Sequence, residues 1–368
     1  MNDTAERPNR AKPELEQEHV SIQSVLDVQE KSAYQRFIGN QSFWVTVALV
    51  AICLGMVWVE PRFATEDNFY NITRNFAFIG IMALGMTPVI ITGGIDLSVG
   101  SVMGLAAIVA GSVLLAETPA WMAGWWPEAA WAHSWWMAVI AGLAAGAVVG
   151  FINGVLIAYV GLPPFVVTLG MLAAARAVGV ILSGNRMLYD FIPDADTFKI
   201  IGGGQNFGFD LPFRLSNPFL IMIVLTIGLA VVLRMATWGR HIYAIGGNEH
   251  AANLTGVPVK RVKVQAYVLC SLSAALAAIL SVGWSGSANN SLGATYELLA
   301  IASVVIGGAN LMGGEGTAYG AFVGAALIFV IRNSLLMAGV DSNWQGIFVG
   351  AFIVLAVLLE RIRGRRRE

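Results

Sequence analysis

TWGRHIYAIGGNEHAANLTGVPVKRVK, residues 237–263, is a polar, glycine-rich segment that ends in basic residues and lies between two long apolar runs. Asn248 can cap a short helix by accepting from its first free N–H groups, and Glu249 suits the positive end of that helix. Gly256 can end the helix. The sequence therefore predicts a helix from Glu249 to Leu254 that is presented at a membrane surface, where a second protein can push on it. The alternative is an ordinary solvated loop.

The composition places most of the chain in lipid. Hydrophobic residues make up 57% of the sequence, charged residues make up 12%, and the mean hydropathy is +0.68. A helix needs roughly 20 apolar residues to cross the membrane, whereas a barrel would show short alternating segments. We therefore expect an all-α, polytopic integral membrane protein with about ten transmembrane helices. The expected spans are 43–59, 74–93, 99–117, 135–159, 165–183, 217–236, 263–283, 297–312, 316–336 and 345–360.

Glycines recur at matching offsets in two parts of the chain. The first set is Gly93, Gly94, Gly100 and Gly104, and the second set is Gly313, Gly314, Gly320 and Gly324. Such clusters permit tight turns, broken helices and close helix packing, so the breaks at 93–98 and 312–316 can lie inside the membrane. The recurrence indicates a duplicated fold. In the ten-span arrangement both copies run in the same direction.

The distribution of basic residues predicts the orientation. Fifteen Lys and Arg residues lie on one side of the ten-span arrangement and five lie on the other. The positive-inside rule then places both termini and the 237–263 segment in the cytoplasm. We expect a polar cytoplasmic tail at 1–42, a membrane domain at 43–360 and a basic cytoplasmic tail at 361–368.

Polar residues inside apolar spans are candidates for a translocation pathway, because they are costly at membrane depth. The candidates are Asp96, Ser98, Asn153, Thr168, Arg176, Asn310 and Glu315. Asp96 can instead cap the helix that follows it, with Ser98 beside it. For Arg176, structural pairing and a position along the pathway both remain open.

Several classes of function lack their usual motifs. The sequence has no GxxxxGK[ST] loop for ATP phosphates, no HExxH and no GxSxG, and its four histidines lack ligand-like spacing. We expect no catalytic residue, no metal site and no cofactor on this chain. The net charge of −1 gives no indication of nucleic-acid binding.

Four stretches resemble the permease subunits of bacterial monosaccharide ABC importers, the ribose, xylose and arabinose group. They are GGIDLSVGS (93–101), PPFVVTLGM (163–171), GRHIYAIGGNEHAANLTGVPVKRVK (239–263) and VIGGANLMGGEGTAYG (305–320). The resemblance implies an inner-membrane homodimer that pairs with a cytoplasmic ATPase, which would bind ATP and Mg, and with a periplasmic sugar-binding protein. It also implies that residues of the third stretch form a coupling loop for the ATPase. The candidate coupling residues are Gly239, Arg240, Gly246, Gly247, Asn248, Glu249, Ala252, Leu254 and Gly256.

Such membership implies alternating access, in which ATP binding closes the ATPase pair and opens the permease dimer to the opposite face. Two alternatives remain: a branched-chain amino acid ABC permease, which would keep the partners and change the substrate, and an ion-coupled sugar carrier that works alone. The transported sugar also stays open, and pentoses, hexoses and cyclic polyols are all candidates.

Overall fold

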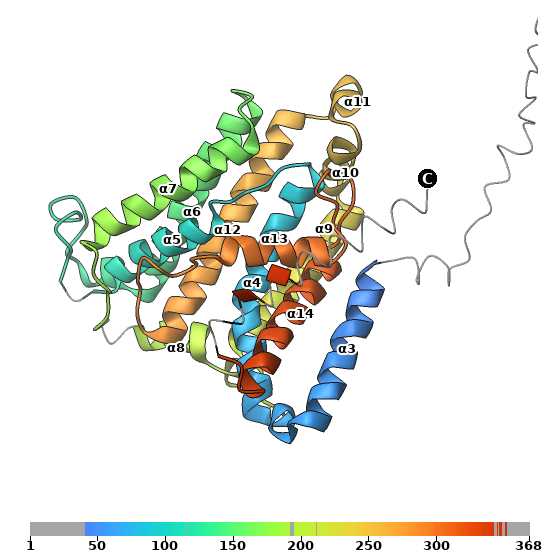
Figure 1. The fold of residues 1–368 in the computed structure, drawn as a ribbon. Coiled ribbons are helices and arrows are strands. Elements are labelled where there is room, and N and C mark those ends of the chain that lie inside the picture. The colour runs from blue at the N-terminus through green and yellow to red at the C-terminus, as the bar shows by residue number, and fades with distance from the viewer. Residues whose placement is uncertain are drawn as a thin grey trace, which may run out of the picture. The chain divides into compact units, whose positions relative to one another are not determined.

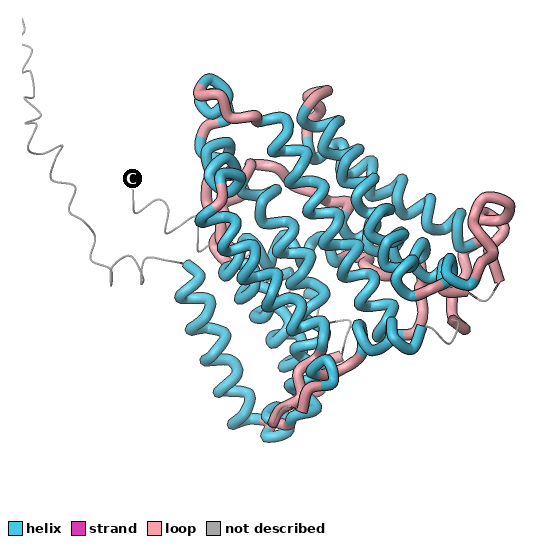
Figure 2. Tube along the Cα trace, turned by 180° about the vertical axis from the view of Figure 1, so that it is seen from behind, coloured by secondary structure: helices cyan, strands magenta, loops and turns pink. Residues whose placement is uncertain are grey.

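The computed structural model describes residues 41–341, apart from 116, 192–194 and 211, and a few positions between 344 and 351. The described chain is a bundle of helices (Figures 1 and 2). The expected N-terminal tail, except for its last two residues, the tenth span at 345–360, except for a few positions, and the C-terminal tail lie outside the described residues.

Nine of the ten expected spans correspond to helices. They are α3 (Gln41–Val59), α4 (Glu66–Ile91), α5 (Val99–Val113), α6 (Trp135–Ala158), α7 (Pro164–Ser183), α9 (Asn217–Met235), α12 (Val259–Ser285), α13 (Tyr296–Ile306) and α14 (Ala318–Met337). Within the described residues, seven of them are long and apolar enough to cross a membrane. The prediction of an all-helical polytopic membrane protein is therefore confirmed.

Helices α5 and α13 are shorter than the predicted spans 99–117 and 297–312. They contain 15 and 11 residues, which at 1.5 Å per residue gives about 22 Å and about 16 Å against a hydrocarbon core of about 30 Å. The reason is that each helix adjoins irregular backbone that also carries apolar side chains. Hydropathy alone counts such residues as part of the span.

Helices α4 and α12 form the centre of the bundle. In their most apolar stretches 89% and 72% of the residues are buried, compared with 11% in α3 and 17% in α9. Helix α12 packs against α4, α5 and α6. Glycines at every fourth position of α6 face α12, and the missing side chains let the two backbones approach closely. These glycines are Gly146, Gly150 and Gly154.

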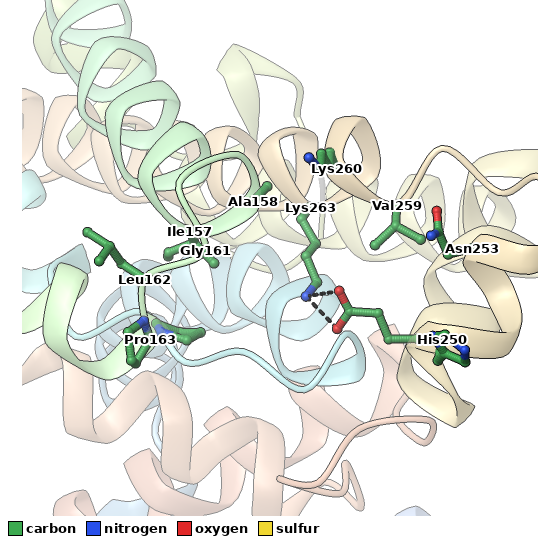
Figure 3. Close-up of a pocket in the computed structure, with 12 residues that line it drawn as sticks. Ile157, Ala158, Gly161, Leu162, Pro163, His250, Asn253, Val259, Lys260 and Lys263 are labelled. Carbon is green, nitrogen blue, oxygen red and sulfur yellow. Dashed lines mark hydrogen bonds and ion pairs between the residues drawn. The ribbon is translucent and has the colours of Figure 1, made fainter.

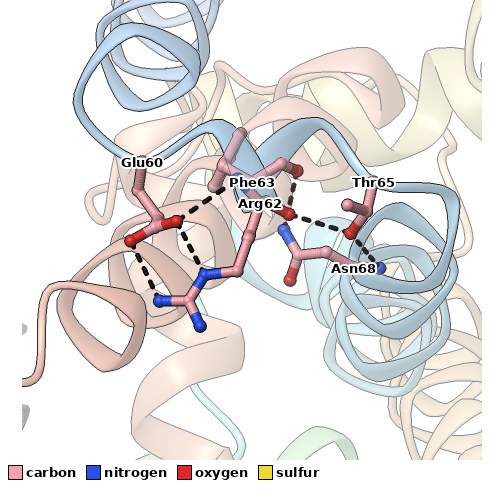
Figure 4. A network of polar contacts seen from close by, with 5 residues as sticks. All are labelled: Glu60, Arg62, Phe63, Thr65 and Asn68. Carbon is pink, nitrogen blue, oxygen red and sulfur yellow. Dashed lines mark hydrogen bonds and ion pairs between the residues drawn. The ribbon is translucent and has the colours of Figure 1, made fainter.

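The turn between α3 and α4 is held by polar contacts (Figure 4). The Glu60 carboxylate accepts from Arg62 Nε at 2.8 Å and Nη2 at 3.1 Å. Thr65 Oγ1 accepts from the backbone N–H of Asn68 and donates to the Arg62 carbonyl. The Asn68 amide donates to the Phe63 carbonyl at 2.9 Å. This network caps the first turn of α4 and fixes the α3–α4 hairpin.

Two irregular breaks contact each other within the bundle. The first break (residues 92–98) joins α4 to α5, and the second break (residues 307–317) joins α13 to α14. The backbone N–H of Gly314 donates to the carbonyl of Ile91, the last residue of α4, at 2.9 Å. Gly313, with φ +95°, packs against the N–H of Gly93. Gly93, Gly313 and Gly314, which belong to the two recurring sets of glycines, therefore meet where the two breaks touch.

Candidate functional site

The 237–263 segment contains two helices before α12 begins. Helix α10 (Thr237–Gly247) follows α9 after an extended residue, Ala236, and helix α11 (Glu249–Leu254) follows the extended residue Asn248. The Asn248 side chain accepts from the backbone N–H of Ala251 at 2.9 Å. Gly256 then adopts φ +85° and turns the chain toward α12. The predicted cap, helix and stop are confirmed, whereas α10 was not predicted.

Helix α10 has a buried face. Ile242 and Ile245 are buried in a small core together with Ile91, Ala252 and Val262. The alternative of a solvated loop is therefore wrong for this part of the segment, because α10 packs on the membrane domain. Its few apolar side chains are separated by glycines and polar residues, which concealed the helical pattern. Helix α11 is different: it has one buried residue, Ala252, and it presents the others to the surface.

Helix α10 also contacts the joint between the two breaks. Gly246 lies directly against the Ile91 carbonyl and the Gly314 N–H, so close that a Cβ atom at this position would overlap both. The Tyr243 hydroxyl donates to the carbonyl of Gly316 at 2.7 Å. Burial raises the pKa of the Tyr243 phenol above its usual range. We call this set the α10 junction: Tyr243, Gly246, Ile91, Gly314 and Gly316.

An ion pair fixes α11 to the start of α12. Lys263 Nζ donates to both carboxylate oxygens of Glu249 at 2.7 Å, and 18% of the Lys263 side chain is exposed compared with 53% for Glu249. The pair lies in a pocket of about 600 Å³ between α11, the start of α12 and the α6–α7 turn (Figure 3). His250 and Lys260 line the same pocket. The arrangement offers a surface with charged groups and a recess beside it.

The candidate coupling residues occupy three environments. Gly239 and Ala252 are buried, and Gly239 packs against the carbonyls of the last turn of α9. Gly246 is half-buried in the α10 junction. The exposed members are Arg240, Gly247, Asn248, Glu249, Leu254 and Gly256. Only the exposed set can meet another protein directly. Their role in coupling stays a prediction.

Three of the pathway candidates meet in the interior. Asp96 is fully buried, and its Oδ1 accepts from the Ser98 N–H at 2.9 Å and from the Ser98 hydroxyl at 2.6 Å. The Asn153 amide of α6 donates to the Ser98 hydroxyl at 3.0 Å. Thr168 Oγ1 lies beside them, 3.4 Å from the Ile95 carbonyl. Asp96 therefore bonds to Ser98, the residue before α5, rather than to an N–H of the helix itself as the capping prediction expected. The cluster ties α6 and α7 to the first break.

The other pathway candidates lie elsewhere. Asn310 and Glu315 belong to the second break, where the Asn310 side chain accepts from the Met312 N–H at 2.9 Å and Glu315 is exposed. Arg176 donates from Nη1 to the Asn290 carbonyl at 2.5 Å. Structural pairing is therefore observed for Arg176. The seven candidates form three separate groups rather than one site.

Two tyrosines near these groups were missed by the sequence analysis. Tyr243 holds the second break, and Tyr267 of α12 is buried with its hydroxyl against Gly94. The Tyr267 hydroxyl, Asp96 Oδ2 and Asn153 Oδ1 are buried without hydrogen-bond partners among the described residues. A tyrosine in an apolar run gives little signal, although a buried hydroxyl usually has a polar partner nearby.

The chain is similar to known transport proteins. The model of the branched-chain amino acid transport system / permease component family matches residues 68–357. The chain is 38% identical to the probable ABC transporter permease protein y4mJ of Sinorhizobium fredii, over 87% of this chain and 89% of that protein. It is 36% identical to the ribose import permease protein RbsC of Escherichia coli, over 85% of this chain and 92% of that protein. It is 32% identical to the fructose import permease protein FrcC of Rhizobium meliloti, over 95% of this chain and 96% of that protein. No solved structure matches the chain.

Proposed function

The chain belongs to the branched-chain amino acid transport system / permease component family, and from this premise we propose that it is the membrane-spanning subunit of an ATP-driven importer for a monosaccharide or related polyol. The observation that favours a sugar over an amino acid is the similarity to permeases named for ribose and fructose. These similarities span 85% and 95% of this chain. The chain itself performs no ATP hydrolysis in this proposal. A cytoplasmic ATPase supplies the energy, and a periplasmic binding protein delivers the sugar.

The family's description favours a second candidate, a branched-chain amino acid importer. The two functions share their partners and differ in substrate, so uptake separates them. The importer would be reconstituted in proteoliposomes with its ATPase and binding protein, and uptake of radiolabelled ribose, fructose, galactose and leucine would be compared with and without ATP. We expect ATP-dependent uptake of one sugar. Uptake of leucine alone would refute the sugar assignment, and sugar uptake driven by an ion gradient without ATP would indicate a secondary carrier.

Coupling to the ATPase is assigned to α11. Its exposed residues protrude beside a recess, and the Glu249–Lys263 pair holds it at the start of α12. A force on α11 reaches α12 through this pair and reaches α10 through the Asn248 connection. A six-residue helix with a cap and an ion pair moves as a unit more readily than a flexible loop.

The α10 junction gives that motion a route into the bundle. Helix α10 contacts the last residue of α4 through Gly246, and it holds the second break through Tyr243. A displacement of α10 therefore acts on α4 and α14 together. ATP shifts the transporter between two arrangements only because the closed ATPase pair binds ATP more tightly than the open pair. We propose that the α10 junction transmits the motion of the ATPase pair to the membrane domain.

A second copy of the chain completes the proposed pathway. Helices α3, α7 and α9 have few buried residues in one copy, and their exposed residues are largely apolar. Lipid and a second copy can each cover such faces. We propose a homodimer with the pathway between the copies, in the inner membrane and with both termini in the cytoplasm.

A further inference from the structure

The loop between α12 and α13 (residues 286–295) runs along one face of α5. Three glycines of α5 receive it in turn, because each lacks the side chain that would block the loop. The contacts pair Gly111 with Ala288, Gly104 with Asn290 and Leu292, and Gly100 with Gly293. The loop therefore follows α5 from its last turn to its first turn.

This path takes non-helical backbone deep into the helix bundle. Gly100 and Gly111 are 11 positions apart, which corresponds to about 16 Å along a helix axis at 1.5 Å per residue. Helix α5 packs beside α6 and α12, both of which are long enough to cross a membrane. The loop thus spans about half of a hydrocarbon core about 30 Å thick. Helix α13, with 11 residues, continues from that depth.

The loop is held firmly on one side. Arg176 of α7 donates to the Asn290 carbonyl at 2.5 Å, and the Asn290 amide donates to the Ser183 hydroxyl at 2.6 Å. The backbone groups of Leu188 and Ala288 exchange two hydrogen bonds of 2.8 Å. The position of the loop is therefore set by α7 and by the segment that follows it.

The other side of the loop is polar and uncovered. Ser291 and Thr295 are exposed, and the Ser291 hydroxyl donates to the Asn289 side chain at 2.7 Å. Thr295 has φ +70°, a strained backbone conformation for a residue with a side chain, and such strain concentrates at functional sites. Irregular backbone at membrane depth persists only where protein buries it or where it lines a water-filled cavity. The exposed side of this loop fits the second case.

We propose that the exposed side of the α12–α13 loop lines the water-filled path of the transporter, with Asn289, Ser291 and Thr295 as contacts for the substrate. Amide and hydroxyl groups both donate and accept hydrogen bonds, and they carry no charge, which suits the hydroxyls of a monosaccharide or polyol. The substrate class in this proposal rests on the proposed function. The presence of water at the loop does not.

Thiol labelling tests the water-filled path. Ser291→Cys, Thr295→Cys and the control Val224→Cys would be made in a chain carrying Cys53→Ala and Cys270→Ala, and the membrane abundance of each would be matched. Val224 is 68% exposed on α9, where lipid should cover it. The hydrated thiolate form of a cysteine attacks a charged methanethiosulfonate reagent, which forms a mixed disulfide and releases methanesulfinate. We expect Ser291→Cys and Thr295→Cys to react at least tenfold faster than the control. Equal rates at all three positions would overturn the proposal.

Uptake kinetics test the substrate contact. In the reconstituted importer, Asn289→Ala and Ser291→Ala should each raise KM for the transported sugar by about 2- to 10-fold, which corresponds to one lost hydrogen bond. Tyr319→Phe, which loses an exposed contact to Thr46 away from this loop, should leave KM unchanged. If the parent importer transports no sugar, the proposed function fails while the labelling result stands. If sugar is transported and both alanine variants keep the parental KM, the loop does not contact the substrate.

Discussion

Replacing Gly246 with alanine should separate ATP hydrolysis from transport. A Cβ atom at this position would overlap the Ile91 carbonyl and the Gly314 N–H, and both are backbone groups that cannot rotate away. Helix α10 must then move from α4 and from the second break. This change breaks the contact through which we propose that α10 moves the membrane domain.

The cost of this substitution is moderate. Overpacking by one methyl group typically costs about 1–3 kcal/mol, whereas folded proteins are stable by about 5–15 kcal/mol. The variant should therefore fold and reach the membrane. The same energy, applied to one of two transport states, changes their ratio by about 5- to 150-fold, since 1.4 kcal/mol is a factor of ten. We expect the rate of sugar uptake to decrease by about 5- to 150-fold while ATP hydrolysis continues.

A glycine of the preceding helix provides a matched control. A Cβ atom at Gly228, inside α9, meets no atom within 4 Å, and Gly228 has no positive φ. Gly228→Ala should therefore transport like the parent. Uptake and ATP hydrolysis would be measured in proteoliposomes at equal protein abundance. If Gly246→Ala and Gly228→Ala transported equally well, the junction would not carry the motion.

Three further predictions concern the coupling segment and the topology. Glu249→Arg should abolish most uptake at normal abundance, because it breaks an ion pair worth about 0.2–1 kcal/mol and places two positive charges together. The double variant Glu249→Lys with Lys263→Glu should restore uptake. Normal uptake by Glu249→Arg would contradict this role. Tyr243→Phe should lower uptake by about 2- to 10-fold through loss of one hydrogen bond. The control Tyr319→Phe, which loses an exposed contact to Thr46, should leave uptake unchanged. Equal uptake by the two variants would show that the Tyr243 hydrogen bond has no role in transport. Reporter fusions should be active in the cytoplasm after Gly247 and in the periplasm after Gly208, and the reverse pattern would overturn the orientation.

Features set by local chemistry were predictable from the sequence. Asn248 is a capping residue, Gly256 is a stop, and the segment between them has the length of a short helix, so α11 was predicted with its bounds. The long apolar runs predicted the principal helices, because a run of about 20 apolar residues is long enough to cross the membrane as a helix. These signals depend on residues within a few positions of one another.

Features set by distant contacts were not predictable. Helix α10 is rich in glycine, which disfavours a helix, and it forms because Ile242 and Ile245 are buried against Ile91 and α12. Nothing in the sequence indicates that Gly246 faces Gly314. The two residues are 68 positions apart, and a glycine carries no sequence signal for the residue that it will contact. The division of the pathway candidates into three groups follows from the same long-range packing.

Crosslinking from Leu254 tests the central claim, that α11 is the point of contact with the ATPase. Leu254 is 74% exposed on α11, and Trp58, which is 87% exposed on α3, serves as the control. Benzoylphenylalanine would replace each residue in the assembled importer, which would be illuminated with and without ATP. We predict a crosslink from position 254 to the ATPase that changes in yield with ATP, and none from position 58. A crosslink to the ATPase from position 58 and none from position 254 would contradict the account.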